Sequence, residues 1–260
     1  MAGIAVRLGT LWGQVRPYRW WIAGGIVGLF ALLFTWLVAT APLGRALEPA
    51  KQPSLIITDM NGKPIARRGD YKEEPVKIAL LPAHVPAAFI AIEDARFYHH
   101  QGLDFRGITR AVWLLATTDN ARVPGGSTIT QQVAKNFLLT NERSIDRKLK
   151  EALLVQRIEQ TFTKDQILEL YLNEIFLGLN SYGVAAASLN YFGKSLDQLS
   201  LEQMAYLAAL PKGPNNYHPF RQKERAIERR NWVLTQMFEN GYITEEEMKA
   251  AQAKPLEVTP

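Results

Sequence analysis

The run from Glu93 to Gly102, EDARFYHHQG, gathers side chains that can move a proton. If the apolar helix before it continues, Glu93, Phe97 and His100 lie at positions i, i+4 and i+7 and share one face. Partial burial beside an aromatic ring and a histidine adjusts the pKa of a carboxylate, as a general acid or base requires. Taken alone, the segment is better explained as a capped, solvated helix end with a His–Glu pair.

A second run, GGSTITQQVAKN over residues 125–136, offers a seat for an anion. Two glycines free the backbone before a helix whose first N–H groups point outward. Thr128, Gln132 and Lys135 then share one face, and Ile129, Val133 and Phe137 are expected to turn toward the core. The lysine follows the second glycine by nine residues, so this is not a Walker motif. An ordinary capped amphipathic helix explains the segment equally well when it is judged alone.

Two further runs are charged and helical in pattern. RKLKE spans Arg147 to Glu151, where the i, i+4 pair by itself indicates nothing more than a surface ion pair on a helix capped by Ser144. KDQILELYLN begins at Lys164 and is followed by Gly178 and by a glycine and three alanines from residue 183. We interpret these small residues as marks of close helix packing.

An apolar segment at residues 22–41 predicts a membrane anchor. Its twenty residues carry no charge and span about 30 Å as a helix, the thickness of a bilayer core. Arg16 and Arg19 precede it, which places the N-terminus in the cytoplasm and the rest of the chain outside. A cleaved signal peptide is the alternative, although its apolar region is usually only about 7–15 residues long.

The rest of the chain is predicted to be mainly α-helical. Residues 54–58 and 64–67 flank Asn61-Gly62 and predict a β hairpin. Capping-box signals recur at Thr128, Thr163, Ser200 and Thr244. We therefore divide the chain into a cytoplasmic arm (1–21), a transmembrane helix (22–41), a linker with the hairpin (42–85), a helical core (86–220) and a C-terminal helical extension (221–260), which is either an appendage to the core or the start of a linker.

Composition excludes several classes of protein. The 260 residues are 47% hydrophobic and contain no cysteine, which excludes a disulfide scaffold, a thiolate metal site and a disordered chain. The net charge is 30 − 25 = +5, and the first 41 residues contribute three arginines and no acid. The basic excess is therefore a weak argument for nucleic acid, which we do not expect as a partner.

Taken in order, the motifs EDARFYHHQG, GGSTITQQVAKN, RKLKE and KDQILELYLN, with GVAAASLNYFGKSL after them, resemble the glycosyltransferase domain of class A penicillin-binding proteins. The resemblance implies a lysozyme-like, mainly α fold with a minor β hairpin, a single-pass protein of the bacterial inner membrane, and a periplasmic or extracytoplasmic active site. It implies lipid II and the growing lipid-linked glycan as substrates, moenomycin as inhibitor, and cell wall synthesis proteins as possible partners.

The resemblance also assigns residues. The glutamate of the first motif becomes the general base, Glu93, and Glu151 becomes a second catalytic carboxylate. Asp94 is expected to hold Glu93 ionised or to position the acceptor, and Lys135, Arg147 and Lys148 to stabilise the departing pyrophosphate. The predicted substrate-binding residues are Asp94, Phe97, His100, Ser127, Thr128, Gln132, Lys135, Asn136, Arg147 and Lys148. We predict no metal-ligating residue, and Mg²⁺ or Mn²⁺ only as a possible companion of the pyrophosphate.

Two competing functions stay open. A lysozyme-like lytic enzyme would use Glu93 as an acid on finished glycan, but its reaction has no pyrophosphate for the cations to stabilise. An inactive membrane scaffold for wall synthesis proteins would have no need of intact motifs. Class A proteins continue into a transpeptidase domain. Because residues 1–260 contain neither Ser-x-x-Lys nor Lys-Thr-Gly, we expect that acyl-transfer half to be absent from this chain. We also expect the Trp113 stretch, residues 110–116, to dip into the membrane or to pack in the core.

Overall fold

The computed structural model describes residues 55–58, 64–68, 71–107, 109, 127–137 and 145–259, with scattered positions between 18 and 36. Within these residues, eight α-helices make up most of the fold: α3 His84–Glu93, α5 Ile129–Phe137, α6 Ile145–Thr161, α7 Lys164–Glu174, α8 Val184–Phe192, α9 Leu201–Ala209, α10 Lys223–Glu239 and α11 Glu245–Ala253. Short 3₁₀ helices occupy Ile78–Leu80, Phe97–His99, Leu196–Gln198 and Pro214–Tyr217. The prediction of a mainly helical domain is confirmed.

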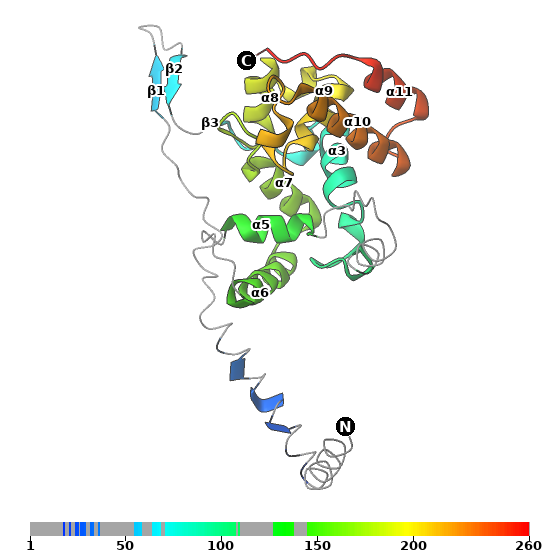
Figure 1. The fold of residues 1–260 in the computed structure, drawn as a ribbon. Coiled ribbons are helices and arrows are strands. Elements are labelled where there is room, and N and C mark those ends of the chain that lie inside the picture. The colour runs from blue at the N-terminus through cyan, green and yellow to red at the C-terminus, as the bar shows by residue number, and fades with distance from the viewer. Residues whose placement is uncertain are drawn as a thin grey trace, which may run out of the picture.

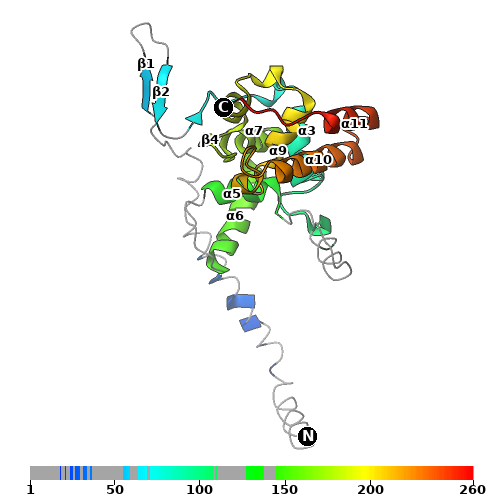
Figure 2. The ribbon, with the colours of Figure 1, turned by 45° about the horizontal axis from the view of Figure 1, so that its top comes forward.

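Strands are few and short in the part of the chain that the structure describes. β1 (Leu55–Thr58) pairs antiparallel with β2 (Pro64–Arg68), which confirms the predicted hairpin, and Ile56 lies opposite Arg67. The Asn61-Gly62 turn lies outside the described residues. A parallel pair of two-residue strands, β3 (Tyr71–Lys72) and β4 (Ser181–Tyr182), was not predicted, because two residues leave no alternation to detect. The hairpin stands beside the helical body (Figures 1 and 2).

Capping boxes start the helices where the sequence predicts them. Thr128 and Gln131 exchange backbone-to-side-chain hydrogen bonds of 2.9 and 3.1 Å at the start of α5. Reciprocal boxes also begin α7 at Thr163, α9 at Ser200 and α11 at Thr244. Each box satisfies N–H groups that have no partner within the first helical turn.

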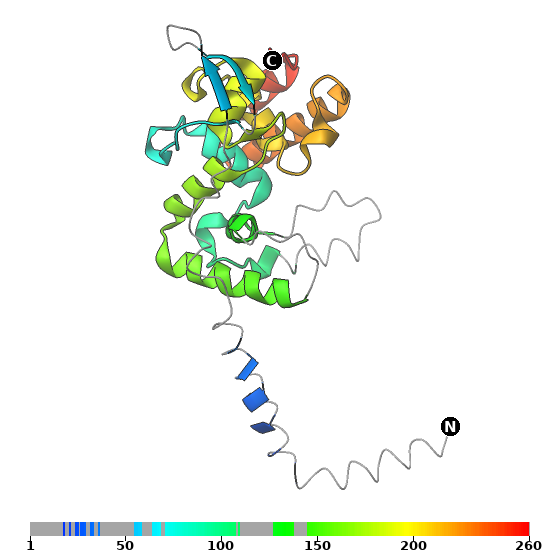
Figure 3. The same cartoon turned by 90° about the vertical axis from the view of Figure 1, so that its left-hand side faces the viewer.

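The helices share one hydrophobic core. α3 is buried along nearly its whole length, from Val85 to Ile92, because α9 and α10 pack against it. The C-terminal helices belong to the same core through Val233, Leu234 and Met237. Figures 1 and 3 show α5 and α6 at one end of the body and α8 to α11 at the other, with α7 running between them.

Two glycines next to α8 confirm the packing interpretation of the small residues. Gly183 has φ +82°, and a Cβ there would lie 2.6 Å from the carbonyl oxygen of Asn173. At Gly178, with φ +85°, a Cβ would lie 2.7 Å from the hydroxyl of Tyr191. A side chain at either position would collide with its neighbours in a backbone conformation that L-residues rarely adopt.

The two segments predicted to contact the membrane lie largely outside the described residues. Most of residues 22–41 and all of residues 110–116 lie outside the described residues. Among the helical residues that are described, none forms a helix long and apolar enough to cross a bilayer. The anchor and the Trp113 stretch therefore stay predictions.

Replacing Gly183 by alanine tests the close approach of α8 to α7. Gly193 at the other end of α8 also has positive φ, +62°, but nothing lies within 4 Å of a Cβ there. Gly193→Ala should cost about 1–2 kcal/mol from the left-handed conformation alone. Gly183→Ala should cost about 1–3 kcal/mol more because of the clash.

Thermal unfolding of the detergent-solubilised protein followed by circular dichroism measures both costs. Equal destabilisation by the two variants would show that the Asn173 carbonyl yields and that packing at Gly183 is loose.

Candidate active site

Glu93 stands at the point where α3 ends. The Asp94 N–H still bonds to the Ile90 carbonyl, at 3.0 Å, but φ −159° at Asp94 takes the chain out of the helix. A 3₁₀ turn over Phe97–His99 follows. The prediction that Glu93, Phe97 and His100 share a helical face is therefore wrong, because the Asp94 carboxylate bonds elsewhere and the helix ends there.

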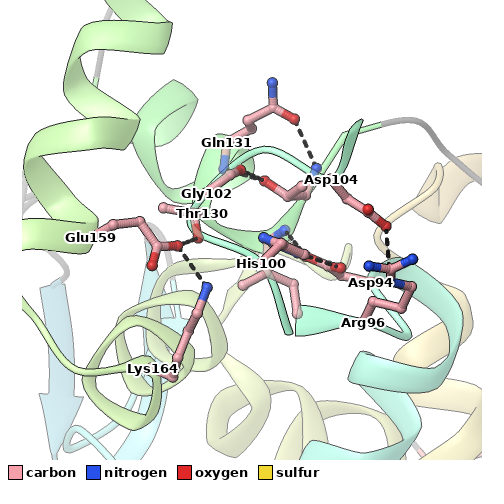
Figure 4. A network of polar contacts seen from close by, with 11 residues as sticks. Asp94, Arg96, His100, Gly102, Asp104, Thr130, Gln131, Glu159 and Lys164 are labelled. Carbon is pink, nitrogen blue, oxygen red and sulfur yellow. Dashed lines mark hydrogen bonds and ion pairs between the residues drawn. The ribbon is translucent and has the colours of Figure 1, made fainter. Parts of the chain in front are cut away.

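Asp94 and His100 form a buried pair. The His100 Nε2 atom lies 2.9 and 3.0 Å from the two Asp94 oxygens, and the side chains are 5% and 4% exposed. Asp94 Oδ2 also accepts the Ile129 N–H at 3.0 Å, at the start of α5. The expected solvated His–Glu pair is thus wrong in its partner and in its exposure. Figure 4 shows His100 directed at Asp94.

Thr128 serves the fold at the start of α5. Its hydroxyl donates to the Gly102 carbonyl at 2.6 Å, and the residue is 2% exposed. Phe97, likewise predicted to contact substrate, is fully buried, whereas Ser127 is exposed. Ile129 and Val133 face the core as predicted. Helical spacing therefore placed Ile129 and Val133 correctly, but the prediction that Thr128 offers its hydroxyl beside Gln132 and Lys135 is wrong, because that hydroxyl is buried against the Gly102 carbonyl.

Gln132 joins α5 to the end of α3. Its Nε2 donates to Glu93 Oε2 at 2.8 Å. Lys135 and Asn136 follow about one turn later on the same helix, and both are exposed. The structure therefore brings the Glu93 carboxylate at the end of α3 against α5, the helix that carries the predicted cationic face.

Glu151 is buried rather than part of a surface pair. It is 3% exposed, its Oε1 accepts from Lys148 Nζ at 2.8 Å, and its Oε2 has no hydrogen-bond partner in the described part of the chain. Lys148 itself is exposed. The backbone of Arg147 lies one residue earlier on α6, and its side chain lies outside the described atoms. The buried Glu151 carboxylate thus holds the exposed Lys148 ammonium, which is the group of the pair that can contact an anionic ligand.

The pKa of Glu93 is raised, chiefly by removal of the carboxylate from water. The Gln132 hydrogen bond and the charges of Arg229 and Lys212 oppose that rise. Asp94 adds to the rise by like-charge repulsion, so the expectation that Asp94 holds Glu93 ionised is wrong. The alternative role of Asp94, positioning the acceptor, stays a prediction.

Lys212 and Arg229 are the site residues that sequence reasoning missed. Lys212 lies in the turn after α9, and Arg229 lies on α10 with its guanidinium 5.9 Å from the Tyr217 ring. Both positions are over a hundred residues from Glu93 in the chain. The sequence contains a Pro-Lys-Gly-Pro run at residues 211–214 and the adjacent pair Arg229-Arg230, but no local pattern links either of them to the first motif.

No metal site is apparent in the described ranges, where no three His, Asp or Glu residues gather closely enough to hold an ion. Assistance from a divalent ion therefore stays a prediction.

The segments that carry these site residues match a known protein family. The family described as Transglycosylase matches residues 61–238, so the chain belongs to that family. The resemblance inferred from the four motifs is confirmed.

Its relatives are penicillin-binding proteins. Penicillin-binding protein 1A of Haemophilus influenzae is 47% identical over 228 residues, which cover 88% of this chain and 27% of that protein. Penicillin-binding protein 1A of Aquifex aeolicus is 46% identical over 241 residues, 91% of this chain and 33% of that one. A crystal structure of the Haemophilus protein aligns at 32% identity over 76% of this chain and 20% of that chain, with a TM-score of 0.45, too low to add to the assignment. The chain thus spans about a quarter to a third of the length of these relatives.

The buried Tyr171 hydroxyl near Glu93 and Asp94 can be tested by mutation. Tyr171 is fully buried on α7, its ring packs edge-on against Phe89, and its hydroxyl has no hydrogen-bond partner among the described residues. Burial and the charges of Glu93 and Asp94 raise its pKa well above the usual value. Tyr171→Phe should therefore leave stability unchanged or raise it, because an unsatisfied buried group is removed.

Tyr191→Phe is the matched control. The Tyr191 hydroxyl donates to the Leu177 carbonyl at 2.8 Å, so its loss should cost about 1 kcal/mol or more. Melting temperatures of the two variants give the comparison. A Tyr171→Phe variant as destabilised as Tyr191→Phe would mean that the Tyr171 hydroxyl has a partner in solution.

Proposed function

We propose that this protein is a peptidoglycan glycosyltransferase that polymerises lipid II into glycan strands at the outer face of the bacterial inner membrane. The proposal rests on one observation: the half-buried Glu93 carboxylate accepts a hydrogen bond from Gln132. Gln132 lies on α5, the helix that also exposes Lys135 to solvent. Membership in the transglycosylase family supports the reaction class. The predicted anchor would keep the enzyme beside its lipid-linked substrates.

The proposed chemistry is an inverting transfer. The acceptor hydroxyl attacks the anomeric carbon of the lipid-linked glycan while the bond from that carbon to the pyrophosphate oxygen breaks. The pyrophosphate leaves with the electron pair, and the hydroxyl proton passes to Glu93. An attacking oxygen on the face opposite the leaving group gives inversion, as in inverting glycosidases.

That step requires a group that accepts the hydroxyl proton and groups that stabilise the negative charge of the leaving pyrophosphate, and residues of this chain are suited to both. Glu93 must be ionised before it can accept a proton, and Lys212, Arg229 and the Gln132 amide all favour the ionised form. Lys135 and Lys148 are exposed cations on α5 and α6, suited to charge that develops on a departing pyrophosphate. We assign Glu151 to holding Lys148, through their 2.8 Å contact.

One observation favours a second candidate. Burial raises the pKa of Glu93, and a protonated carboxyl is what a lytic enzyme would use as a general acid. Incubation with fluorescent lipid II and, separately, with purified glycan strands distinguishes the two functions. Polymer from the first supports the transferase, and fragments from the second support the lytic enzyme.

Glu93→Gln should abolish polymerisation while lipid II binding survives. The amide keeps the shape of the side chain but cannot accept the proton, and a general base contributes about 10²–10⁴-fold to rate. Initial rates on fluorescent lipid II, with binding followed by fluorescence anisotropy, measure the two effects. Glu246→Gln, at an exposed position on α11, is the matched control and should keep full activity. Normal turnover by Glu93→Gln would refute its role as the base.

Lys135→Ala should weaken engagement of the donor. Loss of a charge-assisted contact to pyrophosphate should raise KM and lower moenomycin affinity by about tenfold or more. Arg147→Ala is predicted to act in the same direction. Lys223→Ala, an exposed lysine at the start of α10, controls for the loss of a positive charge. Moenomycin affinity that is unchanged in both Lys135→Ala and Arg147→Ala would count against the cationic site.

A further inference from the structure

A second polar cluster lies on the side of α5 that faces α6 and α7. The Thr130 hydroxyl on α5 donates to Glu159 Oε1 on α6 at 2.6 Å, and Lys164 Nζ on α7 donates to the same oxygen at 2.8 Å. Thr130 is fully buried, and the Glu159 and Lys164 side chains are 9% and 20% exposed. Figure 4 shows the three side chains converging from their separate elements.

A partly buried ion pair of this kind is poorly explained by stability alone. Withdrawing charges from water carries a desolvation penalty, and apolar residues of similar volume often stabilise a protein as well. What the pair supplies is geometry, because its contacts are short and directional. Glu159 can receive Thr130 only when α5 is correctly placed against α6.

The same cluster also reaches the segment that follows Glu93. Lys164 Nζ lies 4.5 Å from the centre of the Phe97 ring, and Phe97 packs edge-on against His100 at 6.3 Å. His100 holds Asp94, which accepts the Ile129 N–H at the start of α5. The cluster is therefore attached to α5 twice, through Thr130 and through the chain that ends on Asp94.

Thr130 and Gln132 lie on different sides of α5. Two residues correspond to about 200° around an α-helix, so a contact that fixes Thr130 against α6 also fixes the direction of Gln132 toward α3. We infer that Glu159 and Lys164 are positioning residues that act through Thr130, setting the rotation of α5 so that the Gln132 amide meets the Glu93 carboxylate. This inference rests on the proposed function.

The inference predicts a change in pH dependence. The groups that act on Glu93 are Asp94, Tyr171, Lys212, Arg229 and the Gln132 amide. Of these, only Gln132 lies on α5, so a rotated α5 removes its hydrogen bond and leaves the cations Lys212 and Arg229, on other elements, in place. That bond lowers the pKa of Glu93, so its loss raises the pKa. Because the base works ionised, the acidic limb of the rate profile must move to higher pH.

A double-mutant cycle on the full chain in detergent micelles tests the inference. The variants are Thr130→Val, Gln132→Leu and the double variant, with kcat and KM for fluorescent lipid II measured across pH. Thr130→Val should lower kcat by about tenfold or more, with KM changed much less, because a small misplacement of a catalytic group is costly. Its acidic limb should move to higher pH, as should that of Gln132→Leu.

The double variant shows whether Thr130 acts through Gln132. If Thr130 acts through Gln132, then Thr130→Val in the Gln132→Leu background should shift the limb no further. Thr130→Ser keeps the hydroxyl and should retain wild-type rates. Thr161→Val, which removes an exposed threonine hydroxyl on α6, is the matched control. Circular dichroism confirms folding, and the isosteric Glu159→Gln replaces Thr130→Val if the latter does not fold.

The outcomes separate the two proposals. Additive shifts in the double variant, or a Thr130→Val limb identical to the wild type, would overturn the positioning role while leaving the proposed function intact. No polymer from the wild type would overturn the proposed function, and the positioning role with it.

Discussion

One carboxylate, partly withdrawn from water, sets the physical problem that the rest of this structure addresses. Burial raises the pKa of Glu93 and so works against the ionised form that can accept a proton. The opposing contributions come from three separate elements: the Gln132 amide on α5, Lys212 after α9, and Arg229 on α10. The protonation state of Glu93 is thus a property of the packed domain, since no single helix supplies it.

The end of α3 shows how the fold meets this requirement. If α3 continued through Asp94, the Asp94 carboxylate would point in another direction and could not accept the Ile129 N–H at the start of α5. Instead, Asp94 turns out of the helix and binds both His100 and the Ile129 N–H. The same contact therefore ends α3, begins α5 in a fixed place, and brings Gln132 within 2.8 Å of Glu93. This arrangement also leaves one like charge near Glu93, and its effect on the pKa of Glu93 is opposed by the cations and the amide.

Local signals in the sequence predict local structure well. The capping boxes at Thr128 and Thr163 were readable because their partners lie three residues away. Non-local pairings were not readable: nothing near His100 indicates Asp94 rather than Glu93, and burial of Thr128 depends on the Gly102 carbonyl, 26 residues distant. Lys212 and Arg229 were missed for the same reason. The resemblance supplied Glu93 and Lys135, which spacing alone would have left as an ordinary helix end and a solvated face.

The cations of the domain fall into two groups with different physical consequences. Lys212 and Arg229 act on Glu93 itself, and their charges are present whether or not a ligand is bound. Lys135 and Lys148 are exposed on α5 and α6, and a charge in contact with water is strongly screened until a ligand displaces that water. The first group therefore favours the ionised form of Glu93 in the free protein. The electrostatic attraction exerted by the second group reaches its full strength only when a bound anion displaces the surrounding water. Under the proposed function, binding of the donor would therefore strengthen the field that stabilises the departing pyrophosphate.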